Sequence, residues 1–437
     1  MTAEACVMNK LGIALATDSA VTATQSGKFK IYQSADKLFQ LSEADPVAAM
    51  VYGSASFLDV PWETIIKQYR GDRGRTSRAT VYEYADDFIR FLESNRNLFP
   101  SARQKFWLPH SVLAEAYGSY LPLVKDGLNR ALEAALSKHG KKLSEQQVKR
   151  TVASAVRRML IEVRKIKLLE GLTNNHITSV HNQCSSELLK LLNGFFQALP
   201  MSQATERDLQ LIISQLYCRR LGERAVSGVV IAGFGRKDVF PSLANLELSG
   251  MVANKLRRGD LHKRGINDQT SAYIVPFAQK EMVSTFMGGI NPGLQGYVSQ
   301  TLKDVFKNLP EIVAGALPSK LSQHRLAFQK KLTVAMSEIL SELISGWQDY
   351  QRTNYSGPIM DVVGVLPKDE LASMAESLVN LTVLRRRTSI DIETVGAPVD
   401  VAIITKGDGF VWIRRKHYFD PALNPRYMSR LSEGAGS

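Results

Sequence analysis

The chain has 437 residues, of which 44% are hydrophobic, so it can bury two or three domain-sized cores or one core with a large insertion. No apolar run approaches the roughly 20 residues of a membrane-spanning helix, and the first residues lack the basic and apolar regions of a signal peptide. These features exclude a membrane-spanning protein and favour a cytoplasmic one. The formal net charge of +13 would attract nucleic acid or acidic partners but says nothing about the fold.

The first fifty residues predict an antiparallel sheet. Small apolar residues from Ala3 to Met8 and from Gly12 to Thr17 flank the turn sequence NKLG, which indicates two strands joined by a tight turn. A second strand pair is expected at 37–42 and 47–53.

Apolar residues then recur at helical spacing from residue 54 to about 221. Within this region, Ser144 and Gln147 form a capping-box pattern at the start of a long amphipathic helix with a basic outer face, expected to close on Gly171. Its apolar stripe would contain Val148, Val152, Ala155, Met159 and Val163.

Strand patterns return at 224–250, 270–277 and 281–289, helical patterns at 292–312, 318–352 and 367–386, and a last hairpin at 398–416. This order predicts an α+β fold whose sheet is assembled from both ends of the chain, with helices on its faces. The expected core comprises residues 1–71 and 223–437, and residues 72–222 form an inserted helical domain.

Three residues near the N-terminus suggest hydrolytic chemistry. Removal of Met1 would leave Thr2 with a free α-amine, which has a reference pKa near 8 and can take the proton of its own hydroxyl group. Lys37 would place positive charge beside the nucleophile and lower the pKa of the amine, and Asp18 would pair with that lysine. No cofactor is expected, and no metal site either, because His176, His181 and Cys184 lack metal-ligand spacing.

Several stretches of the sequence, including those around Thr2, Asp18 and Lys37, resemble the proteasome β-subunit superfamily of N-terminal nucleophile hydrolases, which includes bacterial ring peptidases. The resemblance is carried by residues 2–22, 37–41, 48–55, 228–234 with 239–243, 287–298 and 398–413. It implies a four-layer αββα sandwich and a threonine-type peptidase with catalytic residues Thr2, Asp18 and Lys37.

The resemblance also assigns accessory positions and shows departures. The oxyanion would be held by the backbone N–H at Met50, where the family has glycine. A family serine aligns with Gly289, and a late family aspartate aligns with Asp391, or with Glu393 if the loop differs. The side chains expected to line the substrate pocket are Val21, Ala48 and Tyr52.

Relatives of this kind form rings, so a homo-oligomeric ring acting on a peptide or amide substrate is expected, with an ATP-dependent unfoldase as a further partner. Two alternatives stay open. One is an amidase for small, non-peptide substrates; the other is a catalytically silent scaffold that uses its basic helices to bind nucleic acid or acidic protein. Few aromatic residues accompany the basic residues, which disfavours nucleic acid.

Overall fold

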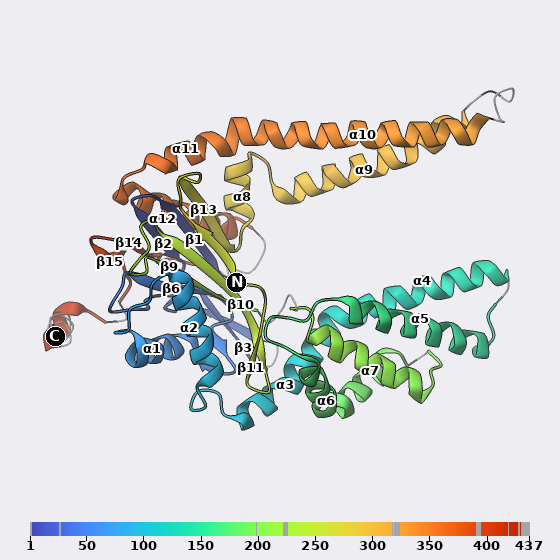
Figure 1. Ribbon diagram of the computed structural model, residues 1–437, viewed down its shortest axis with the longest axis horizontal. Helices are drawn as coiled ribbons and strands as arrows, with labels where there is room; N and C mark the ends of the chain where they lie inside the picture. The colour runs from blue at the N-terminus through green and yellow to red at the C-terminus, as the bar shows by residue number, and fades with distance from the viewer. Residues whose placement is uncertain are drawn as a thin grey trace. The chain divides into compact units, whose positions relative to one another are not determined.

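Both ends of the chain contribute to the first of the two units into which the fold divides. The computed structural model describes residues 2–25, 28–140, 142–197, 199–221, 226–316, 318, 324–389, 395–417, 419–426 and 429. The first unit contains Met1–Ala35, Ile266–Ile403 and Val411–Ser437, and the second contains Asp36–Gly265 and Ile404–Phe410. Along the chain, a first group of strands is followed by a group of helices, a second group of strands, more helices and a final strand pair (Figure 1).

The first unit is built on a five-stranded sheet with the order β13-β1-β2-β14-β15. Its strands are β1 (Ala3–Asn9), β2 (Gly12–Thr17), β13 (Ala272–Ala278), β14 (Asp400–Thr405) and β15 (Gly409–Arg414). Strand β1 pairs antiparallel with β2 on one side and with β13 on the other, so that Cys6 lies opposite both Leu15 and Val275. The predicted hairpin at 3–17, the strand at 270–277 and the last hairpin are therefore confirmed. A separate small hairpin joins β3 (Val21–Gln25) and β4 (Lys28–Tyr32).

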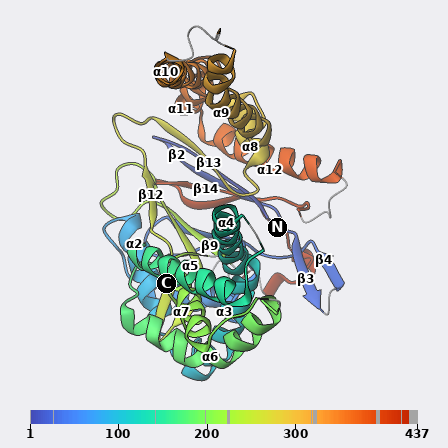
Figure 2. The same cartoon turned by 90° about the vertical axis from the view of Figure 1, so that its right-hand side faces the viewer.

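Helices cover one face of this sheet. Helix α12 (Lys368–Arg387) packs Leu371, Ala375 and Val379 against the alanine-rich face of β1 and β2 (Figure 2). The small side chains let the helix approach closely, and their removal from water stabilises the unit. The shorter helices α8 (Glu281–Gly288) and α11 (Gly357–Val365) add Val283 and Val363 to this core.

The predicted strand at 281–289 is wrong, because these residues form α8. The short helix ends at Gly289, whose positive φ of 69° suits a left-handed helix cap. The Thr285 hydroxyl donates to the Glu281 carbonyl within the turn. A short apolar run cannot be assigned to strand or helix by periodicity alone, and here the glycine cap decides.

The second unit contains a six-stranded antiparallel sheet with the order β11-β10-β9-β6-β5, and β12 also pairs with β10. The strands are β5 (Leu38–Gln40), β6 (Val47–Gly53), β9 (Ser227–Gly233), β10 (Ser242–Val252), β11 (Lys255–Arg258) and β12 (His262–Gly265). Strands β7 (Ser56–Phe57) and β8 (Val60–Pro61) form a small separate pair. Helices α1 (Trp62–Arg73) and α2 (Val81–Ser94) pack on the face that carries Val47, Ala49 and Val51.

Residues between α2 and β9 form a helical block with its own core. It contains α3 (Ser101–Glu115), a π-helical stretch (Ala116–Tyr120), α4 (Leu121–His139), α5 (Glu145–Lys165), α6 (Asn174–Phe195) and α7 (Gln203–Tyr217). The predicted capping box of Ser144 and Gln147 is present in α5, and the predicted stripe contributes to the core. The helix ends at Lys165, six residues before the expected Gly171.

A buried arginine fastens this helical block to the sheet. Arg257 on β11 is fully buried and donates two hydrogen bonds to the Glu115 carboxylate at the end of α3, at 2.6 and 2.7 Å. The Tyr120 hydroxyl donates to the same carboxylate, and the guanidinium lies 3.8 Å from the Tyr217 ring centroid. The Arg257 and Glu115 charges are therefore paired and hydrogen-bonded in the protein interior, where an unpaired charge would be strongly unfavourable.

Replacing Glu115 with alanine should lower the free energy of unfolding by about 3–5 kcal/mol, because Arg257 would keep a buried and unpaired charge. Glu170→Ala is the matched control, since the Glu170 side chain is 47% exposed and lies 4.0 Å from Arg258. It should cost less than about 1 kcal/mol. Chemical unfolding of the three proteins checks this, and equal losses in both variants would contradict the anchoring role.

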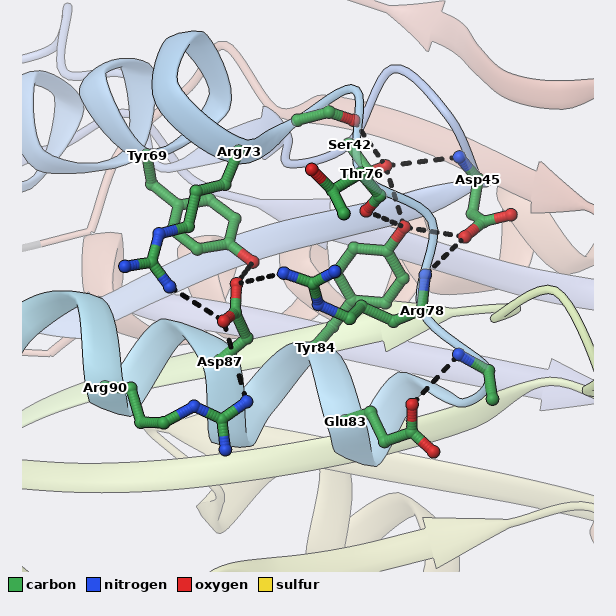
Figure 3. Close-up of polar contacts among 12 residues, drawn as sticks. Ser42, Asp45, Tyr69, Arg73, Thr76, Arg78, Glu83, Tyr84, Asp87 and Arg90 are labelled. Atoms are coloured by element: carbon green, nitrogen blue, oxygen red, sulfur yellow. Dashed lines mark hydrogen bonds and ion pairs between the residues drawn. The ribbon is translucent and has the colours of Figure 1, made fainter.

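A second charged cluster joins α1 to α2 in the same unit. Asp87 receives a hydrogen bond from the Tyr69 hydroxyl at 3.0 Å and ion pairs from Arg73 at 2.8 Å and Arg78 at 3.1 Å, as Figure 3 shows. Burial alone would raise the pKa of Asp87, but the Tyr69 hydrogen bond and the two arginine charges outweigh it and hold the pKa below its usual value.

A carboxylate with a lowered pKa stabilises the fold above its unfolded pKa of about 3.9, and that contribution disappears as the pH falls through the folded value. Asp87→Asn should therefore lower the free energy of unfolding at neutral pH by about 1–3 kcal/mol. The difference from wild type should shrink below about pH 4. Urea unfolding at several pH values measures it, and a difference that stays constant into acid would contradict the account.

Candidate active site

Thr2 directly precedes β1, which lies between β13 and β2 in the sheet, and main-chain contacts fix its position. Its carbonyl accepts a hydrogen bond from the Gln279 N–H at 3.3 Å, which extends the pairing of β1 with β13. The residue is only 4% exposed. The position of the predicted nucleophile is thus set by the sheet rather than by a loop.

Asp18 directly follows β2 and faces Ala3, the residue after Thr2. Its Oδ1 accepts the Ala3 N–H at 3.0 Å, and its own N–H donates to the Ala3 carbonyl at 3.1 Å. Its Oδ2 accepts the N–H groups of Ala20 at 3.1 Å and Gly396 at 3.3 Å. The carboxylate is fully buried and holds the peptide group that links Thr2 to Ala3.

Two contacts at this site were not identified from the sequence. The Gly396 N–H reaches Asp18 from 378 residues further along the chain, and the Gln279 backbone holds Thr2. The Gln279 side-chain oxygen accepts a hydrogen bond from the Arg386 Nε at 2.7 Å. The backbone bends at Ala278, which has a positive φ of 57°, and this bend directs the Gln279 N–H toward Thr2. An alanine gives no sequence signal for such a bend.

Lys37 and Met50 both belong to the second unit: Lys37 directly precedes β5, and Met50 lies on the neighbouring strand β6. The Lys37 carbonyl accepts the Val51 N–H at 2.9 Å, and Leu38 lies opposite Met50. The Lys37 residue is 7% exposed and Met50 is fully buried. Because N–H directions alternate along a strand, the Val51 N–H points to β5 and the Met50 N–H points to β9, where Val230 lies opposite.

The three predicted pocket residues fall in different settings. Ala48 and Tyr52 share the face of β6 that α1 and α2 leave uncovered, and the Tyr52 ring lies across Gly228, where any Cβ would overlap it. The Tyr52 hydroxyl donates to Asn245 at 3.1 Å and Glu247 at 3.3 Å. Val21 is the first residue of β3 in the other unit and is half-buried.

Gly289 forms the cap of α8, and its N–H donates to the Thr285 carbonyl at 2.8 Å. A Cβ at this position would come within 2.4 Å of the Tyr355 ring, so packing as well as backbone conformation requires glycine. This explains physically why no serine occupies the position. Asp391 and its alternative Glu393 lie outside the described residues.

The described part of the chain contains no cluster of three or more metal-ligating side chains. None of the helices that the structure describes combines the length and apolar character needed to cross a bilayer.

Replacing Asp18 with asparagine should lower the free energy of unfolding by about 1–3 kcal/mol, because an amide NH₂ would face backbone N–H donors that now have a carboxylate acceptor. Asp268→Asn is the control, since the Asp268 side chain is 95% exposed in a pair with Lys10, and it should have little effect. Thermal unfolding of both variants checks this. Equal stability of the two variants would show that Asp18 does not fix the start of β1.

Comparison with known proteins gives structural neighbours only. The chain superimposes on an Anbu (Gly-1) mutant from Hyphomicrobium sp. strain MC1 at 9% identity and a TM-score of 0.28, covering 99% of this chain and 96% of that one. Anbu (ancestral beta-subunit) from Yersinia bercovieri gives 9% identity and a TM-score of 0.27, with coverages of 98% and 95%. Anbu from the same Hyphomicrobium strain gives 8% identity and 0.28, with coverages of 98% and 96%.

No family model matches the chain, and no curated protein matches it. Superpositions this loose carry no argument about fold or activity. Because neither a family model nor a curated protein matches, the prediction that the chain belongs to the proteasome β-subunit superfamily is wrong on these findings.

Proposed function

We propose that the protein is an N-terminal threonine amidohydrolase that cleaves peptide bonds through an acyl-enzyme ester on Thr2. The observation that supports this best is the buried Asp18 carboxylate, which holds the Ala3 N–H at 3.0 Å and so fixes the peptide group next to the nucleophile. An ordinary chain end has no such clamp, because terminal residues are usually poorly ordered unless they are tied down.

In this proposal Met1 is removed and the Thr2 amine acts as the base. The Thr2 hydroxyl attacks the amide carbonyl while the amine takes its proton, directly or through water. The amine then returns the proton to the leaving nitrogen, and water hydrolyses the ester. Both groups belong to one residue, so the sheet that positions Thr2 positions the nucleophile and the base together.

Lys37 is proposed as the positive charge that stabilises the oxyanion and lowers the pKa of the amine. Chain connectivity supports this role. The Ala35 N–H donates to the Ser19 carbonyl at 3.1 Å, and Ser19 follows Asp18 directly. Lys37 comes two residues after Ala35, so the Cα atoms of Lys37 and Ala35 are at most about 7 Å apart. The chain therefore keeps Lys37 near the residue that contacts Ser19.

The proposal gives Met50 a smaller part than the sequence suggested. Because the Met50 N–H is directed toward β9, we assign the main stabilisation of the oxyanion to the Lys37 ammonium group rather than to this N–H. The predicted ring and the unfoldase partner rested on the resemblance, and they drop out of the proposal with it.

We also propose that the fold is of the αββα type, with residues 72–222 as an insertion. Its support is that each unit supplies one sheet with helices on one face.

A peptide boronate should bind the activated Thr2 hydroxyl reversibly, and a peptide epoxyketone should label Thr2 covalently, because it reacts with the hydroxyl and the free α-amine of one residue. Thr2→Ala should abolish labelling and peptide hydrolysis, whereas Thr2→Ser should keep labelling. Lys37→Ala should slow the reaction by about 100-fold or more. Mass spectrometry of the labelled N-terminal peptide measures all four proteins.

Labelling that survives Thr2→Ala would contradict the assignment of the nucleophile. Turnover of small amides without turnover of peptides would replace the peptidase with the amidase alternative. A wild-type protein that reacts with neither reagent would contradict catalysis altogether, and would favour the scaffold alternative.

A further inference from the structure

A cavity of about 460 Å³ lies within the second unit. It is bounded by the turn between β7 and β8, by α3, by the start of β9 and by the C-terminal part of β10. Cavities that hold small molecules in proteins usually measure about 300–1,000 Å³. Thr2, Asp18, Lys37 and Met50 are not among the described residues that line it, so the cavity forms no part of the candidate active site.

Three serines among the lining residues have hydroxyl protons to donate. Ser227, the first residue of β9, is only 2% exposed, and its hydroxyl has no hydrogen-bond partner in the part of the chain that the structure describes. Ser249 accepts a hydrogen bond from the Arg257 guanidinium, and Ser111 accepts one from the Tyr217 hydroxyl at 2.9 Å, so both still have a proton to donate. A ligand with acceptor oxygens would satisfy all three serines. Without one, the buried Ser227 hydroxyl costs free energy.

Aromatic side chains of α3 lie at the same cavity. Trp107 is half-buried and lines it, and the neighbouring Phe106 is 60% exposed, with the two ring centroids 5.6 Å apart. His110 also lines the cavity, and its Nδ1 lies 2.8 Å from the Phe106 carbonyl oxygen. A carbonyl oxygen can only accept, so Nδ1 carries a proton, and in the neutral ring Nε2 is left as an acceptor. The α3 wall of the cavity thus combines aromatic surface with a hydrogen-bond acceptor.

The turn between β7 and β8 contains a residue that is unfavourable for its conformation. Its two central residues, Leu58 and Asp59, have positive φ angles of 47° and 66°. Two-residue turns of this kind favour Asn, Asp or Gly, because a bulky side chain is strained at positive φ. Both residues line the cavity, and Asp59 is exposed at its opening. Strain of this kind is typical of positions that serve a ligand.

The charges around the cavity favour a neutral ligand. Among the described residues that line it, Asp59 is the only acid, and there is no lysine or arginine. The charge of Arg257, which donates to Ser249, is already paired with Glu115. An anion would therefore be repelled by Asp59, whereas a cation or a hydrocarbon would give the serine protons no acceptor.

The ligand must offer acceptors to the serines, donors to Asp59 and His110, and an apolar surface to Trp107. A sugar ring meets these requirements, because its hydroxyl groups both donate and accept hydrogen bonds and its C–H groups form an apolar face. A peptide fits less well, since extended peptides are commonly bound by main-chain pairing along a free strand edge. Ser227 pairs with Gly53 on one side and Leu248 on the other, so β9 has no free edge at the cavity.

We propose that this cavity binds a neutral saccharide. One pyranose ring lies with its C–H face on Trp107, and its hydroxyl oxygens accept hydrogen bonds from the three serines. Hydroxyl groups nearer the opening donate to Asp59 and His110. The exposed Phe106 ring offers an apolar surface for a second sugar unit, so a disaccharide binds more tightly than the corresponding monosaccharide.

The test measures binding of cellobiose, lactose and N,N′-diacetylchitobiose to the full-length protein by isothermal titration calorimetry. At least one of the three disaccharides should bind the wild-type protein and raise its melting temperature. Trp107→Ala should abolish measurable binding, because the sugar loses the aromatic surface on which it rests. Ser227→Ala should weaken binding by about ten-fold, the effect of one lost hydrogen bond.

Ser227→Ala separates a binding role from a structural one. Because the Ser227 hydroxyl has no partner in the free protein, its removal should leave the melting temperature of the free protein unchanged or raise it. Ser214→Ala is the matched control: Ser214 is also buried, but its hydroxyl donates to the Gln210 carbonyl at 2.9 Å, and it does not line the cavity. Ser214→Ala should bind the disaccharide as tightly as the wild-type protein.

The proposal is overturned if none of the three disaccharides binds, if Ser227→Ala binds as tightly as the wild-type protein, or if Ser227→Ala lowers the melting temperature of the free protein. Binding of the neutral peptide N-acetyl-trialanine amide in place of the disaccharides, lost in Trp107→Ala, would overturn it in favour of a peptide site. None of these results depends on the labelling of Thr2, so the saccharide site and the proposed catalysis can fail separately.

Discussion

The buried carboxylate of Asp18 is the constraint on which the candidate site depends. A carboxylate removed from water requires hydrogen-bond donors, and here three backbone N–H groups, from Ala3, Ala20 and Gly396, supply them. One donor belongs to the first strand, one to the turn after β2 and one to the segment before β14. The same group therefore ties the start of the chain to a segment near its other end, and the position of Thr2 follows from a contact that the fold needs in any case.

Other buried charges in the molecule follow the same principle. Arg257 is matched by Glu115 and Asp87 by Tyr69, Arg73 and Arg78, and each pair lies where a helix meets another helix or a sheet edge. Pairs of this kind specify one arrangement strongly, because a shifted packing would leave a charge buried without a partner.

Local patterns predicted much of the secondary structure. The capping box of Ser144 and Gln147, the alternation in β1 and β2 and the turn of the last hairpin are all short-range signals, and the structure confirms them. Residues 281–289 show the limit of such signals, because a run of nine residues with few polar positions suits either a strand or a helix until its cap is considered. At the site, the sequence placed Thr2 and Asp18 on adjacent strand ends. It could not supply Gly396 or Gln279, since contacts across hundreds of residues leave no periodic pattern. The direction of the Met50 N–H depends on which neighbour Val51 faces, and that is a property of sheet register rather than of residue type.

The proposed chemistry depends above all on a free amine on Thr2, held beside the Asp18 clamp. The most direct measurement is N-terminal sequencing, together with the intact mass, of the protein isolated from cells. The account predicts threonine in the first cycle and a mass lower than that of the encoded chain by one methionine residue. Retention of Met1, or an acyl group on Thr2, would contradict it, because the residue proposed as nucleophile would then have no base.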